Sequence, residues 1–459
     1  MHRISNSLLR RARVLWRRRA QRGATEQLHH FQRRIATLAG AVLLGLIALA
    51  FAAVADSAQQ LFDAIVAQWP YAPLVLTPLT FAGIVWATRA WASEARGSGI
   101  PQVIAAGRML GSPATQPLVS MATAAKKLVL TVGMLLGGAS VGREGPTVQV
   151  SAAIMVWVHK LLRVPITAGV LIAGGGAGVA AAFNTPLAGV AFAIEELAAA
   201  YEQRVAILVM GAVMIAGMVS LGVAGDYVYF GVIHQSLPIG SVLVLAPVMG
   251  VLGGLSGGLF SRAVLRFLTP DRPWIALAHR RPVLFAAGCG LTVAVLGVAT
   301  VGATWGTGYG ATKALVEGGH QSLWFGPAKF VATLATTLSG APGGVFAPSL
   351  AVGAGLGNLV KGMFPHDPAG AIVVLGMVAY FVGVVRAPFT AVIIVSEATA
   401  GRGMILPMFA TAIIADAVSA LVCRERLYHG LSRPFLDAAR QPRPANAASA
   451  MPPPAPAAP

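Results

Sequence analysis

The stretch ASVGREGPTVQV, residues Ala139–Val150, places two ionisable side chains inside a strongly apolar part of the chain. Arg143 and Glu144 are neighbours between glycines, and Pro146 follows them. Ionisable side chains in apolar surroundings are costly unless they are paired or bind something. The function of this pair therefore depends on what the rest of the chain builds around it.

The composition is that of a membrane protein. Of 459 residues, 56% are hydrophobic and 11% charged, whereas soluble domains have about 25% charged residues. A membrane-spanning helix needs roughly 20 apolar residues. Apolar runs recur near Leu38–Ala53, Leu74–Ala87, Leu128–Leu136, Ile166–Phe183, Ala206–Val223, Val242–Leu259, Val283–Val301, Ala371–Val385 and Ile405–Val422. We therefore expect an all-α polytopic membrane protein. Its 53 glycines and 29 prolines predict broken or re-entrant helices, which are tolerated where protein or a cavity covers them.

The net charge of +18 comes largely from short basic segments beside apolar runs. Residues 1–34 contain ten arginines and one acid. Two further clusters are Arg262, Arg266, Arg272, Arg280 and Arg281, and Arg424, Arg426 and Arg433. By the positive-inside rule these segments, and both termini, belong on the cytoplasmic side. No aromatic residues are interleaved with them for base stacking, so we expect no nucleic-acid partner.

We expect three regions along the chain. Residues 1–34 form a basic cytoplasmic N-terminal segment, 35–433 the transmembrane domain, and 434–459 a tail rich in Pro and Ala. The low-complexity stretch from Gln441 cannot pack a core, so the tail is predicted to be disordered. No folded cytoplasmic domain is expected after the last apolar run.

The chain contains an internal repeat. Matching residues recur at an offset of 202 positions: Lys127 and Lys329, Thr131 and Thr333, Leu136 and Leu338, Gly138 and Gly340, Gly142 and Gly344, Pro146 and Pro348, Gly174 and Gly376, Pro186 and Pro388, and Glu195 and Glu397. These matches predict two homologous halves, about 35–222 and 239–425. The first apolar run starts at a basic flank, whereas its counterpart ends at one. We therefore expect the halves to be inverted relative to each other.

Inversion would bring two Gly/Pro interruptions to one place. GREGP (Gly142–Pro146) and GVFAP (Gly344–Pro348) hold equivalent positions, and each proline suits the first turn of a following helix. Two helices that start at mid-membrane from opposite sides direct their N-termini at each other. Each N-terminus carries about four unpaired N–H groups and roughly half a positive charge. This arrangement predicts an anion site without a fixed full counter-charge, which would hold a transported anion too tightly.

A third segment, GSGIP (Gly97–Pro101), has an echo in GTGYG (Gly306–Gly310) at a slightly larger offset. Its glycines allow close approach of the backbone to an ion. The Ser98 hydroxyl can donate one more hydrogen bond.

GSGIPQ, GREGP and GGVFAP, in this order and spacing, resemble the signature segments of the CLC chloride channels and chloride/proton antiporters. The resemblance runs from about Arg34 to Leu436 and includes AAAFNTPLAGVAFAIEEL, RAPFTAVIIVSEAT and a tyrosine after the last run. It implies the CLC fold of the bacterial type, a homodimer with a pore in each subunit, and a place in the bacterial inner membrane. Chloride and protons would be the transported ions.

The resemblance also implies roles for individual residues. The hydroxyls of Ser98 and Tyr428 would bind the central anion. Backbone amides would complete the sites, those of Val345 and Phe346 at the central site and those of Arg143, Glu144 and Gly145 at an outer site. Glu144 would be the gating glutamate, whose carboxylate competes with chloride, and Glu196 would be the internal proton-accepting glutamate.

Elementary electrostatics supports the role of Glu144. A carboxylate among the first N–H groups of a helix is partly compensated and takes the place of an anion. Protonation would remove its charge and let it swing away, so one side chain could be both gate and proton carrier. The alternative is that Glu144 only caps its own helix and pairs with Arg143; the matching inverted segment makes this the weaker interpretation. For the Arg143 side chain, a role in holding the loop stays open.

The remaining acids near the apolar runs bear on the transport mode. Glu195 has a repeat partner, Glu397, which suggests a shared structural role such as a subunit contact or helix-end pairing. The position equivalent to Glu196 in the second half is occupied by Ala398, so this carboxylate is not repeated. A directional proton route requires such a break in symmetry. Antiporters of the family typically have Glu at that position, which favours chloride/proton antiport. A passive voltage- or pH-gated chloride channel is the alternative. We expect Asp416 to be structural or interfacial.

Other classes of function are disfavoured. None of the nine histidines sits inside an apolar run with a nearby Ser, Cys or carboxylate partner, so no enzyme is expected; those at run ends or in loops include His159, His234, His320, His366 and His429. Cys289 and Cys423 lack metal-ligand spacing, and we expect no metal or cofactor beyond the bound chloride. A transport-dead scaffold conflicts with the intact site residues. By resemblance, serine at position 98 goes with chloride, and proline there with nitrate preference.

Overall fold

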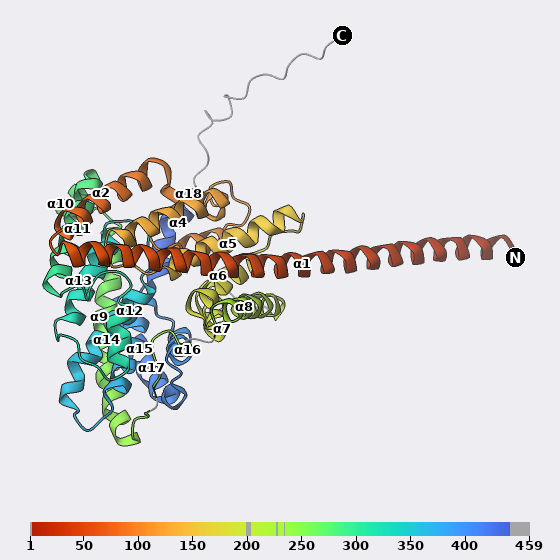
Figure 1. The fold of residues 1–459 in the computed structure, drawn as a ribbon. Coiled ribbons are helices and arrows are strands. Elements are labelled where there is room, and N and C mark those ends of the chain that lie inside the picture. Colours follow the sequence, from red (N-terminus) through yellow and green to blue (C-terminus); the bar gives the residue numbers. More distant parts are fainter. Residues whose placement is uncertain (1, 199–202, 226–227, 234, 441–459) are drawn as a thin grey trace, which may run out of the picture.

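The computed structural model describes residues 2–198, 203–225, 228–233 and 235–440. Within these ranges the regular structure is helical (Figure 1). The helices are α1 His2–Gln68, α2 Pro73–Trp91, α3 Ile100–Arg108, α4 Met121–Leu136, α5 Glu144–Leu161, α6 Ala168–Phe183, α7 Pro186–Phe192, α8 Gln203–Ala224, α9 Ile239–Phe267, α10 Pro273–Arg280, α11 Pro282–Ala299, α12 Tyr309–Val316, α13 Phe325–Leu338, α14 Phe346–Val360, α15 Ala369–Val385, α16 Pro388–Thr399, α17 Ile405–Val422 and α18 Leu427–Arg440. Five single turns, η1 Ser93–Ala95, η2 Gln116–Val119, η3 Ala193–Leu197, η4 Lys361–Met363 and η5 Arg402–Met404, connect them.

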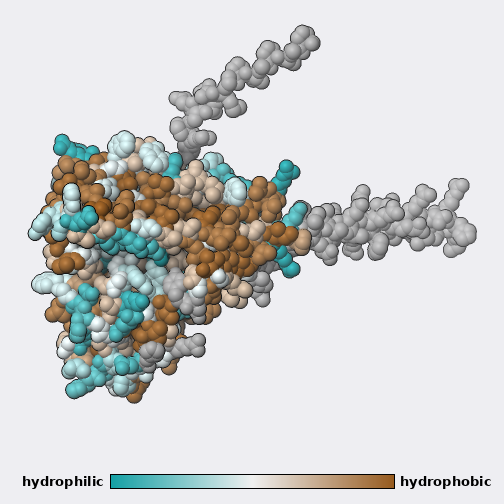
Figure 2. All heavy atoms as spheres, viewed as in Figure 1, coloured by the Kyte–Doolittle hydropathy of each residue, from teal (hydrophilic) through white to brown (hydrophobic). Residues whose placement is uncertain are grey.

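Several helices are long and apolar enough to cross a bilayer. Over the described residues they are Phe31–Gln68, Pro73–Trp91, Ile239–Arg266, Pro282–Ala299 and Ile405–Val422. Each apolar run expected from the sequence falls almost entirely within a helix. In Figure 2, hydrophobic side chains cover much of the surface alongside the part of α1 that packs on the body. The prediction of an all-α integral membrane protein is confirmed.

The boundaries of the expected regions differ from the helices at both ends. α1 is one continuous helix from His2 to Gln68, so no break separates residues 1–34 from the first span, and its N-terminal part extends beyond the body (Figure 1). α18 continues through Pro434 to Arg440. Residues 434–440, which the sequence assigned to the tail, are therefore part of this helix, and Leu436 is buried against α3 and η2. Residues 441–459 lie outside the described part of the chain.

The centre of the fold is built from two helices without an exposed face. All side chains from 169 to 183 in α6 and from 371 to 385 in α15 are buried. Both helices are apolar all round, as expected for helices enclosed by others. Small residues let their neighbours come close: a methyl group on Gly376 of α15 would lie 2.3 Å from the Gly353 carbonyl oxygen of α14. α6 packs against α5, and α15 packs against α14. In each repeat, the helix that starts at the Gly/Pro segment therefore lies against a fully buried helix.

Reciprocal contacts show that the two repeats are related by a two-fold axis. The Glu195 carboxylate accepts hydrogen bonds from the amides of Phe389 (3.1 Å) and Thr390 (2.7 Å) at the start of α16. Glu397 does the same for α7. Its partners are Leu187 and Ala188, at 3.2 and 2.8 Å. When residue i of one half contacts j of the other and their equivalents repeat the contact in reverse, the interface is isologous. The expected inverted repeat is confirmed, and the shared role of Glu195 and Glu397 is helix-end capping.

Candidate anion and proton site

Two helix N-termini meet at the repeat axis. The Gly142 amide donates to the Gly344 carbonyl at 2.7 Å, and the Gly344 amide donates back to Gly142 at 2.8 Å. α5 begins two residues after Gly142, and α14 begins two residues after Gly344. A side chain does not fit here, because a methyl group on Gly344 would lie 2.8 Å from the Gly145 amide nitrogen. The predicted convergence of GREGP and GVFAP is therefore confirmed by direct contact.

Glu144 lies between these N-termini. Its side chain is fully buried. The carboxylate is close to the backbone amides of Glu144 itself and of Ala347 in α14, without the geometry of a direct hydrogen bond. Among the described residues it has no ion-pair partner within 4 Å. The carboxylate thus occupies the position that two helix N-termini make favourable for a negative charge.

The Arg143 side chain turns away from this point. It forms an ion pair with Asp56 at 2.6 Å and donates to the Ala52 carbonyl at 2.9 Å, both in α1. The Arg143 Nη2 lies 3.5 Å from the Tyr229 hydroxyl oxygen. The sequence left open an ion pair between Glu144 and Arg143. In the structure the Arg143 guanidinium pairs with Asp56 instead. The Arg143 side chain instead ties the loop before α5 to α1.

Ser98 and Tyr428 approach the same point from other elements. Ser98 precedes α3, where Gly99 has a φ of 108°, a conformation that favours glycine. A methyl group on Gly145 would lie 2.4 Å from the Ser98 Oγ. Tyr428, in the first turn of α18, places its hydroxyl close to that of Ser98. Neither hydroxyl has a hydrogen-bond partner of good geometry in the described part of the protein, so both are free to bind a ligand.

The aromatic ring of Phe346 closes the site on the α14 side. Its centroid lies 5.9 Å from that of Tyr428 and 4.9 Å from that of Phe381 in α15. Val345, the residue before α14, is 6% exposed and lines a cavity. The structure therefore brings together all seven residues that the sequence proposed for the anion, namely Ser98, Arg143, Glu144, Gly145, Val345, Phe346 and Tyr428.

A buried lysine orients the Ser98 loop. The Lys127 ammonium, on a side chain with no exposure, donates to the Ala95 carbonyl at 2.8 Å and to the Gly97 carbonyl. In the second repeat Lys329 donates in the same way to Thr304 at 2.9 Å and Gly306 at 2.8 Å. The sequence showed these lysines only as a repeat match. Their function as loop anchors depends on carbonyls that no local pattern identifies.

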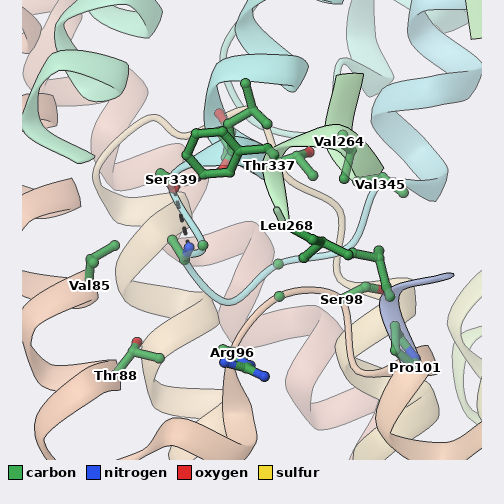
Figure 3. Close-up of a pocket in the computed structure, with 18 of the residues that line it drawn as sticks. Val85, Thr88, Arg96, Ser98, Pro101, Val264, Leu268, Thr337, Ser339 and Val345 are labelled. Atoms are coloured by element: carbon green, nitrogen blue, oxygen red, sulfur yellow. Dashed lines mark hydrogen bonds between the residues drawn. The ribbon is translucent and has the colours of Figure 1, made fainter. Parts of the chain in front are cut away.

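Two cavities reach toward the site. The first, here called the Ser98 cavity, has a volume of about 620 Å³ and is lined by Ser98, Arg96, Gly344, Val345 and Tyr428 among others. Figure 3 shows Ser98 and Pro101 next to each other, and Arg96 on the side of the cavity opposite Thr337.

The second, here called the Asp56 cavity, has a volume of about 550 Å³ and is lined by Asp56, Asp63, Arg143, Tyr229 and Tyr309 among others. Glu144 lines neither cavity. In the chain it stands between Arg143, which lines the Asp56 cavity, and Gly145, where an added methyl group would lie 2.4 Å from the Ser98 Oγ of the Ser98 cavity.

Glu196 lies in the π-helical turn η3, and its side chain has no exposure. Neither of its carboxylate oxygens has a hydrogen-bond partner of good geometry in the described ranges. The nearest charged or titratable group is His429 of α18, whose Nδ1 lies 3.4 Å from the Glu196 Oε1. Tyr428, the neighbour of His429, is within electrostatic range of both Glu196 and Glu144. The sequence alone predicts an ordinary histidine at position 429, beyond the last apolar run; its place next to Tyr428 is the signal that could have identified it.

Asp416 has a structural partner. It forms an ion pair with Arg386 at 3.1 Å, and Arg386 also donates to the Arg424 carbonyl at 3.1 Å. The expectation of a structural role for Asp416 agrees with this contact, which connects α17 to the left-handed residue that ends α15.

Comparisons with known proteins agree with this architecture. A family model described as "Voltage gated chloride channel" matches residues 79–420. The chain is 32% identical over 392 residues to an H(+)/Cl(-) exchange transporter ClcA of Citrobacter koseri, covering 80% of each chain. It is 30% identical over 422 residues to the ClcA of Yersinia pseudotuberculosis, covering 85% of each.

Solved structures show the same fold. A slow cyanobacterial Cl−/H+ antiporter matches with a TM-score of 0.75 and 23% identity, over 88% of this chain and 98% of that one. A CLC-type fluoride/proton antiporter matches with a TM-score of 0.72 and 21% identity, over 85% and 96%. The repeat geometry, the facing helix N-termini and the extent of these matches lead to one conclusion: the chain belongs to the voltage gated chloride channel (CLC) family.

Proposed function

We propose that this protein exchanges chloride for protons across the bacterial inner membrane, with Glu144 as the gate. The observation that carries the proposal is the position of the Glu144 carboxylate, which is buried between two facing helix N-termini, while Arg143 before it lines the Asp56 cavity and Gly145 after it contacts Ser98 of the Ser98 cavity. Two of the relatives at 30–32% identity are H(+)/Cl(-) exchange transporters, which supports the same activity here.

The gate works by competition for one position. While Glu144 is ionised, its carboxylate takes the place of an anion between the amide ends of α5 and α14 and closes the path. Protonation removes the charge and with it the attraction to these amides. The neutral side chain leaves, and a chloride ion takes its place. Because the amides carry partial charges only, the chloride is held weakly enough to move on.

The central site holds the anion on its way through the Ser98 cavity. The free hydroxyls of Ser98 and Tyr428 and the amides of Val345 and Phe346 replace part of the hydration shell of chloride. The Gly145 and Gly344 backbones come close enough to leave no room for a side chain at this position. Arg143 contributes its amide, while its side chain stays on Asp56.

Protons leave the anion path on the side of Glu196. Tyr428 lies within electrostatic range of both Glu196 and Glu144. A proton that leaves Glu144 therefore reaches Glu196 past the Tyr428 ring. The passive channel is disfavoured, because a second ionisable side chain buried in the membrane is costly and indicates a function of its own, here the proton route.

Basic residues set the orientation. Ser98 and Tyr428 line the same cavity, and Tyr428 follows Arg424 and Arg426 closely in the chain. The arginines before Phe31 and those at 424 and 426 would face the cytoplasm by the positive-inside rule. The Ser98 cavity then opens to the cytoplasm and the Asp56 cavity to the outside. We also infer a homodimer, as the family resemblance implies, with a complete site in each subunit.

The test is simultaneous recording of chloride and pH outside proteoliposomes loaded with chloride. We expect chloride efflux accompanied by proton movement in the opposite direction, and in Glu144→Gln we expect chloride efflux without proton movement. Chloride efflux from the unaltered protein without any proton movement would show a channel. A protein that moves neither ion would exclude transport, provided that it elutes as a single species in detergent.

A further inference from the structure

The buried carboxylate of Glu196 leaves an open question about proton entry. Its side chain has no exposure, so it cannot exchange protons with the solution unaided. A proton must pass through a group that touches both Glu196 and solvent. In the described part of the chain, one partly exposed titratable side chain lies within 4 Å of the Glu196 carboxylate.

That group is His429. Its Nδ1 is buried and lies 3.4 Å from the Glu196 Oε1, while its side chain as a whole is 27% exposed. The Nδ1 has no hydrogen-bond partner of good geometry in the described ranges, so its lone pair or proton is available for the carboxylate. Imidazole is the side chain whose ordinary titration lies between pH 5 and 8, which suits it to pass protons at neutral pH.

The charged groups next to His429 and Glu196 form hydrogen bonds with other partners. The neighbouring Glu195 carboxylate is turned to Phe389 and Thr390 and caps α16. The Arg426 guanidinium lies 3.5 Å from the Glu195 carbonyl oxygen rather than on the Glu196 carboxylate.

Two other titratable groups near this contact do not compete for it. Glu425, just before α18, is paired with Arg433 at 2.8 Å. The Tyr428 hydroxyl faces Ser98.

We propose that His429 is the proton relay between the cytoplasmic solution and Glu196. This rests on the proposed function, in which Glu196 takes part in proton transport. In the inward step, a hydronium ion of the cytoplasmic solution protonates Nε2 of a neutral ring that carries its proton on Nδ1, and a water molecule remains. The Nδ1–H bond then breaks as an O–H bond forms on Glu196, and the ring keeps the proton on Nε2. Rotation of the partly exposed ring, or proton exchange with water, restores the first tautomer. No oxidation or reduction is involved.

The experiment compares His429→Gln and His429→Ala in proteoliposomes with simultaneous chloride and pH recording. Gln keeps a hydrogen-bonding group near Glu196 but cannot carry a proton at neutral pH. We expect both variants to keep chloride transport within about 2-fold and to lose at least about 10-fold in proton flux. This is below the ~10²–10⁴-fold effect of a general acid or base that acts in the reaction itself, because water can replace part of the path. Imidazole added on the cytoplasmic side should restore the proton flux of His429→Ala.

The matched control is His366→Gln, which alters an exposed histidine in the loop before α15 and should leave both fluxes unchanged. Wild-type proton flux in His429→Gln would show that the ring only positions Glu196, and it would overturn the relay. Failure of imidazole to rescue His429→Ala would overturn it too. Retained chloride transport shows that the variants fold.

Glu196→Gln separates this inference from the function on which it rests. Normal proton flux in Glu196→Gln would remove the role of Glu196 itself. Impaired flux in Glu196→Gln together with normal flux in both His429 variants would reject the relay alone.

Discussion

Gly142 and Gly344 exchange two backbone hydrogen bonds, at 2.7 and 2.8 Å, on the axis that relates the two repeats. Because the exchange is reciprocal, it fixes the start of α5 against the start of α14 and so holds two helix N-termini a few residues apart. Both residues come just before the segments that bind the anion in our proposal.

Gly145→Ala should abolish most chloride transport. The new methyl group would lie 2.4 Å from the Ser98 Oγ and 3.1 Å from the Gly344 Cα, so the three segments of the site cannot keep their positions. We expect chloride efflux from proteoliposomes to fall at least about 100-fold, as displacement of a positioned group by about 1 Å commonly does. Gly288→Ala, in α11, meets nothing within 4 Å and should transport normally. Normal transport by Gly145→Ala would place the anion elsewhere.

Ser98→Pro should raise the preference for nitrate over chloride. Proline removes both the free hydroxyl and the backbone N–H next to the site. One lost hydrogen bond of about 1 kcal/mol corresponds to roughly a 5-fold change in relative binding. Isothermal titration of each anion and flux in nitrate gradients would measure the change. An unaltered ratio would show that Ser98 does not select the anion.

Glu196→Gln should uncouple the two ions. The amide cannot be protonated at the pH of transport, while the anion site at Ser98 and Glu144 is untouched. We expect chloride transport of similar rate and proton flux near background, measured in the same vesicles. Proton coupling that persists in this variant would mean that protons take another route.

Asp56→Asn should shift the acid activation of chloride transport to lower pH. Removal of the Asp56 charge frees the Arg143 guanidinium, now 2.6 Å from that carboxylate, to act on Glu144. A nearby positive charge favours the ionised form of Glu144, so more acid is needed to open the gate. Because Asp56 is 59% exposed, the ion pair contributes at most about 1 kcal/mol, which is a shift of up to about 0.7 pH unit. Chloride flux measured as a function of external pH gives the midpoint, and a shift to higher pH would contradict this account.

Glu195→Ala should destabilise the protein more than Glu397→Ala. Glu195 accepts three hydrogen bonds, two from the backbone of α16 and one from the Thr390 hydroxyl at 2.7 Å. Glu397 accepts two from the backbone of α7. Loss of such a cap leaves amides unpaired and costs roughly 1–3 kcal/mol. Thermal unfolding in detergent should show the lower midpoint for Glu195→Ala. Equal midpoints would mean that the third hydrogen bond contributes nothing.

Much of the architecture could be predicted from the sequence because its signals are local or periodic. Apolar runs of sufficient length identify membrane helices wherever they lie in the chain. The constant offset of 202 residues between Lys127 and Lys329, or Glu195 and Glu397, reports a duplication without any knowledge of the fold. Gly and Pro four residues apart mark helix starts, and inversion of the halves then requires these starts to face each other. The anion site therefore follows from sequence and symmetry alone.

Only the tertiary structure shows the contacts that do not follow the symmetry of the two repeats. His429 meets Glu196 across more than 200 residues of chain, and Arg143 reaches Asp56 in α1 rather than its own neighbour Glu144. Separation along the chain does not limit distance in the fold, so composition and spacing contain no record of such pairs.

The same holds for η3, where a π-helical turn, with its wider hydrogen-bond spacing, changes the direction of Glu196 relative to an ordinary helix. The sequence by itself determined the membrane class, the inverted repeat and the place where two helix N-termini meet. The contacts of the buried charges were decided only by packing, because which groups compensate a charge removed from water depends on the atoms that the whole fold brings to it.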